Sequence, residues 1–142
     1  MIGRIALALM LLVSPLLSWA DIGQIKSLSG EVWLVRDGQR VEVEEGTRLN
    51  ATDVIETGSD GRVGFMLADN SRMSAGPNSK VALERFSFDP TTHDGESVTS
   101  ITKGTLSIIS GQLAKHSKDA MTVRTPSSVL AVRGTRFLIQ VD

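Results

Sequence analysis

The residues best suited to bind a metal ion lie in the polar stretch 89–96. Asp89, His93, Asp94 and Glu96 fall within eight positions and offer carboxylate oxygens and an imidazole nitrogen. Divalent cations take ligands of these kinds. The stretch contains no hydrophobic residue, however, so a solvent-exposed loop is the favoured interpretation and a metal site is the alternative.

Nucleophilic catalysis is not expected from this chain. It has no cysteine and two histidines, His93 and His116, neither of which lies beside a strand-to-helix turn of the kind that exposes a catalytic serine. The 13 glycines stand singly and form no phosphate-binding loop. We therefore predict that the protein is not an enzyme and carries no cofactor.

Three arginines near the C-terminal end could bind carboxylates of a partner. Arg124, Arg133 and Arg136 lie in the segment 121–142, and a guanidinium group presents a planar set of donors that matches a carboxylate. In the alternative interpretation, Arg133 satisfies carbonyl groups of the turn that it forms with Gly134, and the other two arginines line a solvent face. The sequence favours this structural role for Arg133.

The segment 121–142 has the pattern of three strands separated by turns. Met121 and Val123 alternate with polar neighbours, and Pro126 ends this run because proline has no amide hydrogen. A second apolar run covers 129–132. The last residues alternate again, with Phe137, Ile139 and Val141 on one side and with Arg136, Leu138, Gln140 and Asp142 on the other.

Gly134 separates the last two apolar runs and is expected to adopt a backbone conformation that is closed to other residues. Gly134→Val would then cost about 1–3 kcal/mol. Gly61→Ala is expected to be milder, because Gly61 is expected to lie in a surface hairpin.

The first 20 residues have the features of a cleaved signal peptide. Arg4 supplies a positive charge, residues 5–13 are uninterruptedly apolar, and Ser18 and Ala20 are small residues at the two positions that signal peptidase reads. This run is about half of the roughly 20 residues that a spanning helix needs, so cleavage is favoured over a retained membrane anchor. The expected mature chain begins at Asp21 and is periplasmic or secreted.

Composition limits what the exported chain can bind. Cleavage removes one of the 15 basic side chains and none of the 16 acidic ones, which leaves 14 basic against 16 acidic. This balance predicts no general attraction to nucleic acid or anionic lipid. Without cysteine there is neither a disulfide nor a site for lipid attachment to cysteine. The domain 21–142 must therefore be held by its apolar core alone.

Turns recur about every 8 to 12 residues after position 21, which is typical of an all-β domain. The clearest hairpin joins 31–36 to 40–44 through Asp37 and Gly38. A second hairpin is expected around Lys103 and Gly104, and one helical turn could occupy 114–120. The expected fold has short antiparallel strands in a roll or solenoid-like arrangement, with a β-sandwich as the alternative.

Two single residues carry further expectations. Trp33 is expected in the core, because a small β domain needs a large side chain to fill it. Asn70 is expected in the left-handed conformation, which asparagine tolerates better than most residues.

The order Val-Arg-Thr-Pro at 123–126, a short apolar stretch and Val-Arg-Gly-Thr-Arg-Phe at 132–137 resembles the closing signature of the FecR domain. Asn70 stands where that family has glycine. The resemblance spans residues 30–141. Earlier positions of the family pattern are occupied by Gly46, Leu49, Asp53, Val54, Ile55, Thr57 and Gly58.

The resemblance implies a solenoid-like periplasmic module that relays a signal from an outer-membrane receptor, through a membrane helix, to a segment that controls a sigma factor. Here no cytoplasmic segment precedes the apolar run and no further domain follows Asp142, so direct control of a sigma factor is not expected. What the resemblance supports is a stand-alone exported binding or signalling module. Its motif residues, and candidates for partner contact, are Arg124, Arg133, Gly134, Thr135, Arg136 and Phe137.

Two functions of different class follow from these patterns. The first is a non-enzymatic module that docks on an envelope protein or a cell-wall polymer. The alternative is an exported protein that binds a small ligand or a divalent metal through the loop 89–96.

Overall fold

A computed structural model describes residues 21–132 and 136–142. Their regular secondary structure consists of strands, apart from the short helix α1 (Gln112–His116). The all-β prediction is confirmed. In chain order the strands are β1 (Gly23–Ser29), β2 (Val32–Arg36), β3 (Gln39–Glu42), β4 (Arg48–Leu49), β5 (Val54–Thr57), β6 (Arg62–Leu67), β7 (Arg72–Ala75), β8 (Lys80–Phe88), β9 (Gly95–Ile109), β10 (Met121–Arg124), β11 (Val129–Ala131) and β12 (Arg136–Val141).

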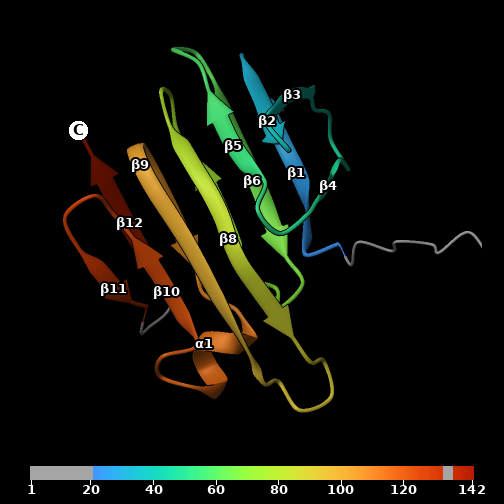
Figure 1. The fold of residues 1–142 in the computed structure, drawn as a ribbon, viewed down its shortest axis with the longest axis vertical. Coiled ribbons are helices and arrows are strands. Elements are labelled where there is room, and N and C mark those ends of the chain that lie inside the picture. The colour runs from blue at the N-terminus through green and yellow to red at the C-terminus, as the bar shows by residue number, and fades with distance from the viewer. Residues whose placement is uncertain (1–20, 133–135) are drawn as a thin grey trace, which may run out of the picture.

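The strands form one curled sheet whose two halves share the long strand β9 (Figure 1). Half-sheet A has the order β4-β1-β6-β7-β9-β12, and half-sheet B has the order β3-β2-β5-β8-β9-β10-β11. All neighbours are antiparallel except β10, which runs parallel to β9. The result is an open roll, which is one of the arrangements expected from the sequence.

β9 belongs to both halves because it bends at a glycine. Its first part, 95–103, pairs with β8, and its second part, 104–109, pairs with β12 and partly with β7. Gly104, with φ of 95°, stands at the change, and a Cβ atom there would lie 2.1 Å from Oγ of Ser79. The predicted hairpin at Lys103 and Gly104 is therefore wrong: the glycine redirects a continuous strand and does not end it.

The core lies inside the curl, between the two half-sheets. Both half-sheets contribute side chains that are at most 2% exposed, and twelve of them show how the core is shared. They are Ile25, Val63, Phe65, Leu67, Leu106 and Ile108 from half-sheet A, and Leu34, Ile55, Val81, Leu83, Ile101 and Val123 from half-sheet B. Because strands β1 to β4 contribute to this same cluster, the segment before residue 53 is built into the same core as the segment after it.

The hairpin between β2 and β3 is confirmed, and so is the conformation of Asn70. Asp37 and Gly38 have φ values of 51° and 75°, as a two-residue hairpin turn requires. Asn70 has φ of 67°, in the left-handed region.

Trp33 does not lie in the core, contrary to prediction. It is partly exposed on the outer face of β2, where its indole N–H donates to Glu56 and the guanidinium carbon of Arg40 lies 4.1 Å from the ring centroid. Leu34, the next residue, takes the buried position. The alternation of the strand allows only one of these two neighbours to face inward.

The turn at Asp60 and Gly61 is not a surface hairpin. It connects β5 to β6, which lie in different half-sheets. Gly61 is buried, and a Cβ atom there would lie 2.1 Å from the carbonyl oxygen of Glu31. The prediction that Gly61→Ala is mild is therefore wrong, because the added methyl group would collide with backbone.

Helix α1 follows β9 directly and begins two residues before the single turn expected at 114–120. Within 21–132 and 136–142, no helix is both long enough and apolar enough to cross a membrane. The expected signal helix of residues 1–20 lies outside the described residues.

Candidate functional site

The three C-terminal strands extend both half-sheets on the same flank of β9. β10 lies beside residues 97–100 of β9 and carries β11 on its other edge, which lengthens half-sheet B. β12 pairs with residues 104–109 and lengthens half-sheet A. β11 and β12 are therefore the last strands of the two halves on this flank, and the curl is open between them.

A groove of about 570 Å³ occupies this opening, and we call it the C-terminal groove. One wall is formed by 125–128 together with Leu130, and the other by 138–142 of β12 and the residue after it. The first wall is firmly held. The amide of Thr125 donates to the carbonyl of Ser128 at 2.8 Å, and the amide of Ser128 donates to the hydroxyl of Thr125 at 3.0 Å.

Two of the three exposed large hydrophobic side chains of the described residues line the C-terminal groove. Val129 is 63% exposed, Leu130 is 42% exposed and Leu138 is 72% exposed. Leu130 and Leu138 line the groove, and Val129 is the neighbour of Leu130 on β11. Single exposed apolar residues are common, but a group of them around a groove marks a surface that binds another apolar surface.

Among the residues predicted for partner contact, the three that the structure describes do not form one cluster. The side chain of Arg124 is 54% exposed and lies 3.3 Å from the carboxylate of Glu84, on half-sheet B. Arg136 is exposed at the start of β12, on half-sheet A. Phe137 is partly buried and packs against the core. Arg133, Gly134 and Thr135, with the predicted conformation of Gly134, lie outside the described residues.

The sequence reasoning did not identify Val129, Leu130 and Leu138 as surface residues. For Leu138 a signal was present, because it shares the alternation of the polar residues Arg136 and Gln140. For Val129 and Leu130 no local signal distinguishes an apolar edge strand from a buried one, since exposure depends on which strand lies beside it.

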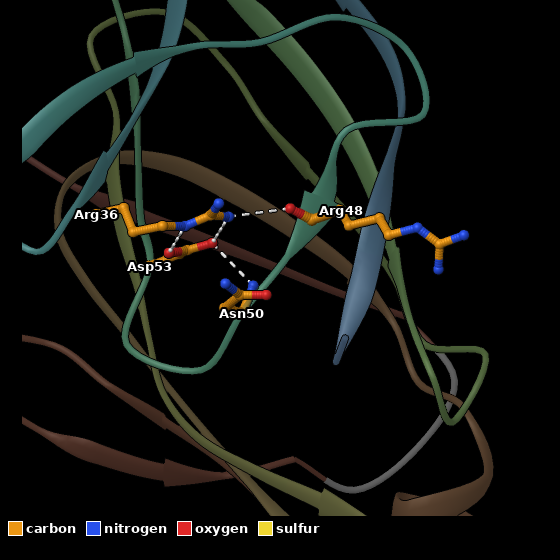
Figure 2. Close-up of polar contacts among 4 residues, drawn as sticks. All are labelled: Arg36, Arg48, Asn50 and Asp53. Carbon is orange, nitrogen blue, oxygen red and sulfur yellow. Dashed lines mark hydrogen bonds and ion pairs between the residues drawn. The ribbon is translucent and has the colours of Figure 1, made fainter. Parts of the chain in front are cut away.

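An ion pair between Arg36 and Asp53 holds together two segments of the N-terminal half of the domain. Both carboxylate oxygens of Asp53 accept from Arg36, with Nε–Oδ1 at 2.9 Å and Nη2–Oδ2 at 2.7 Å, and Asp53 is 1% exposed (Figure 2). The amide of Asn50 donates to Oδ2 at 2.8 Å, and Arg36 also reaches the carbonyl of Arg48. The hydrogen bonds that Arg36 donates to Asp53 raise the pKa of Arg36 above its usual value. The pair ties β2 to the loop before β5.

Asp53 is also where the comparison with known families begins. The family model described as FecR protein matches residues 53–142, which is more than half of the chain. The chain belongs to the FecR family. Comparison with curated proteins gives no match, and comparison with solved structures gives none either. The matched region covers β5 to β12 and therefore includes the C-terminal groove.

The turn of residues 69–71 in this FecR chain has a structural role. Asp69 is fully buried, and its carboxylate accepts from the amide and hydroxyl of Ser71 at 3.0 and 2.8 Å. Its backbone carbonyl accepts from Gln112 at 2.8 Å, and its side chain accepts from the amide of Leu113 at 3.3 Å. The turn between β6 and β7 thus binds the free amides at the start of α1.

The loop 89–96 does not assemble a metal site in this FecR structure. The carboxylate of Asp89 accepts from the amides of Thr91 and Thr92, and these bonds lower the pKa of Asp89. Across 21–132 and 136–142, no three histidine or acidic side chains converge as metal ligands would. The other candidate ligands have local partners: His93 stacks on Phe88, Asp94 lies 2.9 Å from His116, and Glu96 lies 3.9 Å from Arg85.

A second groove of about 520 Å³ lies on half-sheet A. Its floor is a row of small residues in register across β1, β6, β7 and β9, namely Ser27, Gly64, Ser74 and Ser107. The described residues that line it include neither an aromatic ring nor a carboxylate. This groove is a consequence of small side chains, and Arg62 is the one charged side chain among the described residues that line it.

Proposed function

We propose that this FecR-family chain is a non-enzymatic signalling module of the cell envelope that docks on another envelope protein. The docking surface is the β10–β11 hairpin with its turn, at residues 125–130. The observation that carries the proposal is the exposure of Val129 and Leu130 on a short edge strand whose turn is held by internal hydrogen bonds. Family membership supports the signalling-related role, since the match includes this hairpin.

A protein partner is favoured over a cell-wall polymer. The hairpin exposes an aliphatic side chain on each of its faces, because the consecutive strand residues Val129 and Leu130 point to opposite sides. The polar groups of Thr125 and Ser128 line the groove together with Leu130. Protein interfaces combine an apolar centre with a polar rim in this way. A hydroxyl-rich polymer offers little apolar surface, so it would recover little of the free energy gained by removing aliphatic side chains from water.

Export to the periplasm is part of the proposal and rests on residues 1–20. A positive charge, an apolar run and small residues at positions 18 and 20 precede Asp21. Mass spectrometry of the protein recovered from the envelope fraction is expected to give Asp21 as the first residue. Retention of residues 1–20 would replace the released module with a membrane-anchored one.

Site-specific cross-linking in intact cells tests the docking surface. A photo-reactive amino acid at Val129 is expected to capture one discrete envelope protein. The same group at Gln39, an exposed residue on the far edge strand β3, is the matched control and is expected to capture none. The substitution Val129→Asp should reduce capture by a cross-linker placed at Ser127, because it introduces a charge into the apolar centre.

Two results would contradict the docking proposal. One is equal capture at Val129 and Gln39, which would mean nonspecific contact. The other is co-sedimentation with purified cell wall that is lost in Val129→Asp, which would assign the hairpin to a polymer. If the protein signals without the hairpin, neither cross-linking nor co-sedimentation will change when Val129 is substituted.

A further inference from the structure

β12 is the longest of the four edge strands in the described part of the roll. The edges are β3 with four residues, β4 with two, β11 with three and β12 with six. An edge strand presents a row of backbone N–H and C=O groups that can pair with another strand. Figure 1 shows β12 on the same flank of β9 as β10 and β11. Residues 138–141 of β12 line the C-terminal groove, opposite 125–128 and Leu130.

β12 also lacks several of the features that prevent edge pairing. Natural edges are protected by being short, by inward-pointing charges or by proline. β12 contains no proline, and its inward residues Phe137, Ile139 and Val141 are apolar and half-buried against the core. Leu138 on its outer face is 72% exposed. Charges stand only at its two ends, at Arg136 and at Asp142, which directly follows the strand.

We propose that β12 pairs with β12 of a second copy of this chain, antiparallel, across a two-fold axis at Ile139. The positions of the charges select this register. When Ile139 faces Ile139 of the second copy, Arg136 lies opposite Asp142 of the second copy, and the symmetric pair forms at the other end. The two opposite-charge pairs close both ends of the new ladder, as complementary cross-strand pairs do.

The same register matches the remaining side chains. Directly opposed residues in a ladder point to the same face of the sheet. Phe137 therefore meets Val141 of the second copy on the inner face, and Leu138 meets Gln140 of the second copy on the outer face. The inner apolar residues of the two strands form one surface, and the second copy covers the half-exposed wall of the C-terminal groove.

The dimer goes beyond the proposed docking function and does not depend on it. It uses β12, whereas docking uses the β10–β11 hairpin.

The chain's lack of cysteine provides a direct test by disulfide cross-linking. In the proposed register only position 139 faces itself, with Cβ atoms at cross-strand distance, which is close enough for a disulfide. Ile139→Cys in the exported full chain is expected to form a covalent dimer under mild oxidation. Leu138→Cys and Gln140→Cys, which face each other and not themselves, are the controls and should form far less.

Charge exchange with sedimentation measurements provides the second test. Arg136→Glu and Asp142→Arg should each weaken dimerisation about tenfold or more, because each places like charges opposite at both ends. The double variant should restore it. Arg62→Glu, at an exposed arginine on β6, is the control for added charge.

A wild-type chain that stays monomeric at about 100 μM would overturn the dimer. So would equal cross-linking at 138, 139 and 140, or a double variant as weak as the single ones. None of these results bears on capture of an envelope protein at Val129, so the dimer and the docking function can fail separately.

Discussion

Arg36 donates two hydrogen bonds to the carboxylate of Asp53, from Nε to Oδ1 at 2.9 Å and from Nη2 to Oδ2 at 2.7 Å (Figure 2). The two residues are far from equal in exposure, since the side chain of Asp53 is 1% exposed and that of Arg36 is 32% exposed. The partly exposed guanidinium group of Arg36 therefore lies between the buried carboxylate of Asp53 and the solvent. A buried charge is tolerated only when it is paired and hydrogen-bonded, so the fold around β5 depends on Arg36.

Removing the arginine should destabilise the protein. Arg36→Ala leaves the buried carboxylate of Asp53 with the amide of Asn50 but without its cation, and the free energy of unfolding should fall by about 2–3 kcal/mol. Arg36→Lys keeps the charge but loses the two-pronged contact, and should cost about 1 kcal/mol. Chemical denaturation measures both.

Arg48→Ala is the matched control for the Arg36 variants. Its side chain is 71% exposed and pairs with Asp21 at the surface, while its backbone carbonyl, which Arg36 uses, is unchanged by the substitution. It should change stability by less than about 0.5 kcal/mol. Equal denaturation midpoints for Arg36→Ala and Arg48→Ala would mean that Asp53 needs no cation.

The buried turn at Asp69 should control the order of α1. Asp69→Ala removes the acceptor of Ser71 and Leu113 and leaves their donors buried. A loss of about 2–3 kcal/mol is expected, with faster amide exchange at Leu113. Asn70→Gly is the control, since glycine adopts the φ of 67° without strain and should be nearly neutral. If amide exchange at Leu113 is unchanged in Asp69→Ala, the turn at Asp69 does not stabilise the start of α1.

Gly104, at the bend of β9, should not tolerate a side chain. Gly104→Ala adds a methyl group at a φ of 95° and within 2.1 Å of Oγ of Ser79, so strain and collision together should cost about 3 kcal/mol. Gly38→Ala has a similar φ of 75° but open space around it, and should cost about 1 kcal/mol. If thermal melts give equal stability losses for Gly104→Ala and Gly38→Ala, Ser79 must move to make room for the added methyl group.

The sequence could predict features that depend on neighbours in the chain. The hairpin at Asp37 and Gly38 and the left-handed Asn70 follow from the backbone preferences of those residues, and the alternation of β12 follows from the period of two. Each of these is decided within a few residues.

Features that depend on distant segments could not be predicted in this way. Gly104 has the residue type of a turn, but its role is set by Ser79, which packs against it from 25 positions away in sequence. Trp33 and Leu34 are equally good candidates for the core, and pairing with β3 and β5 decides which one faces inward. The exposure of Leu130 likewise depends on β11 having no strand beside it on one edge within the described residues.

The loop between β8 and β9 should lose order in acid because of Asp89. Its carboxylate accepts from the amide of Thr91 at 2.8 Å and from that of Thr92 at 3.3 Å, and these bonds lower the pKa of Asp89 from its usual value of 3.8. Because the folded pKa lies below the unfolded one, the stabilisation is fully present above about pH 3.8 and is lost as the pH falls through the folded pKa.

An NMR titration measures this effect at the residues involved. The carboxyl carbon of Asp89 should titrate below pH 3.8, and the amide shifts of Thr91 and Thr92 should follow the same curve, since protonation weakens the acceptor of both bonds. Asp89→Asn should abolish the titration of the two amide shifts while β8 and β9 remain paired. Amide shifts that titrate unchanged in Asp89→Asn would assign the effect to a group other than Asp89.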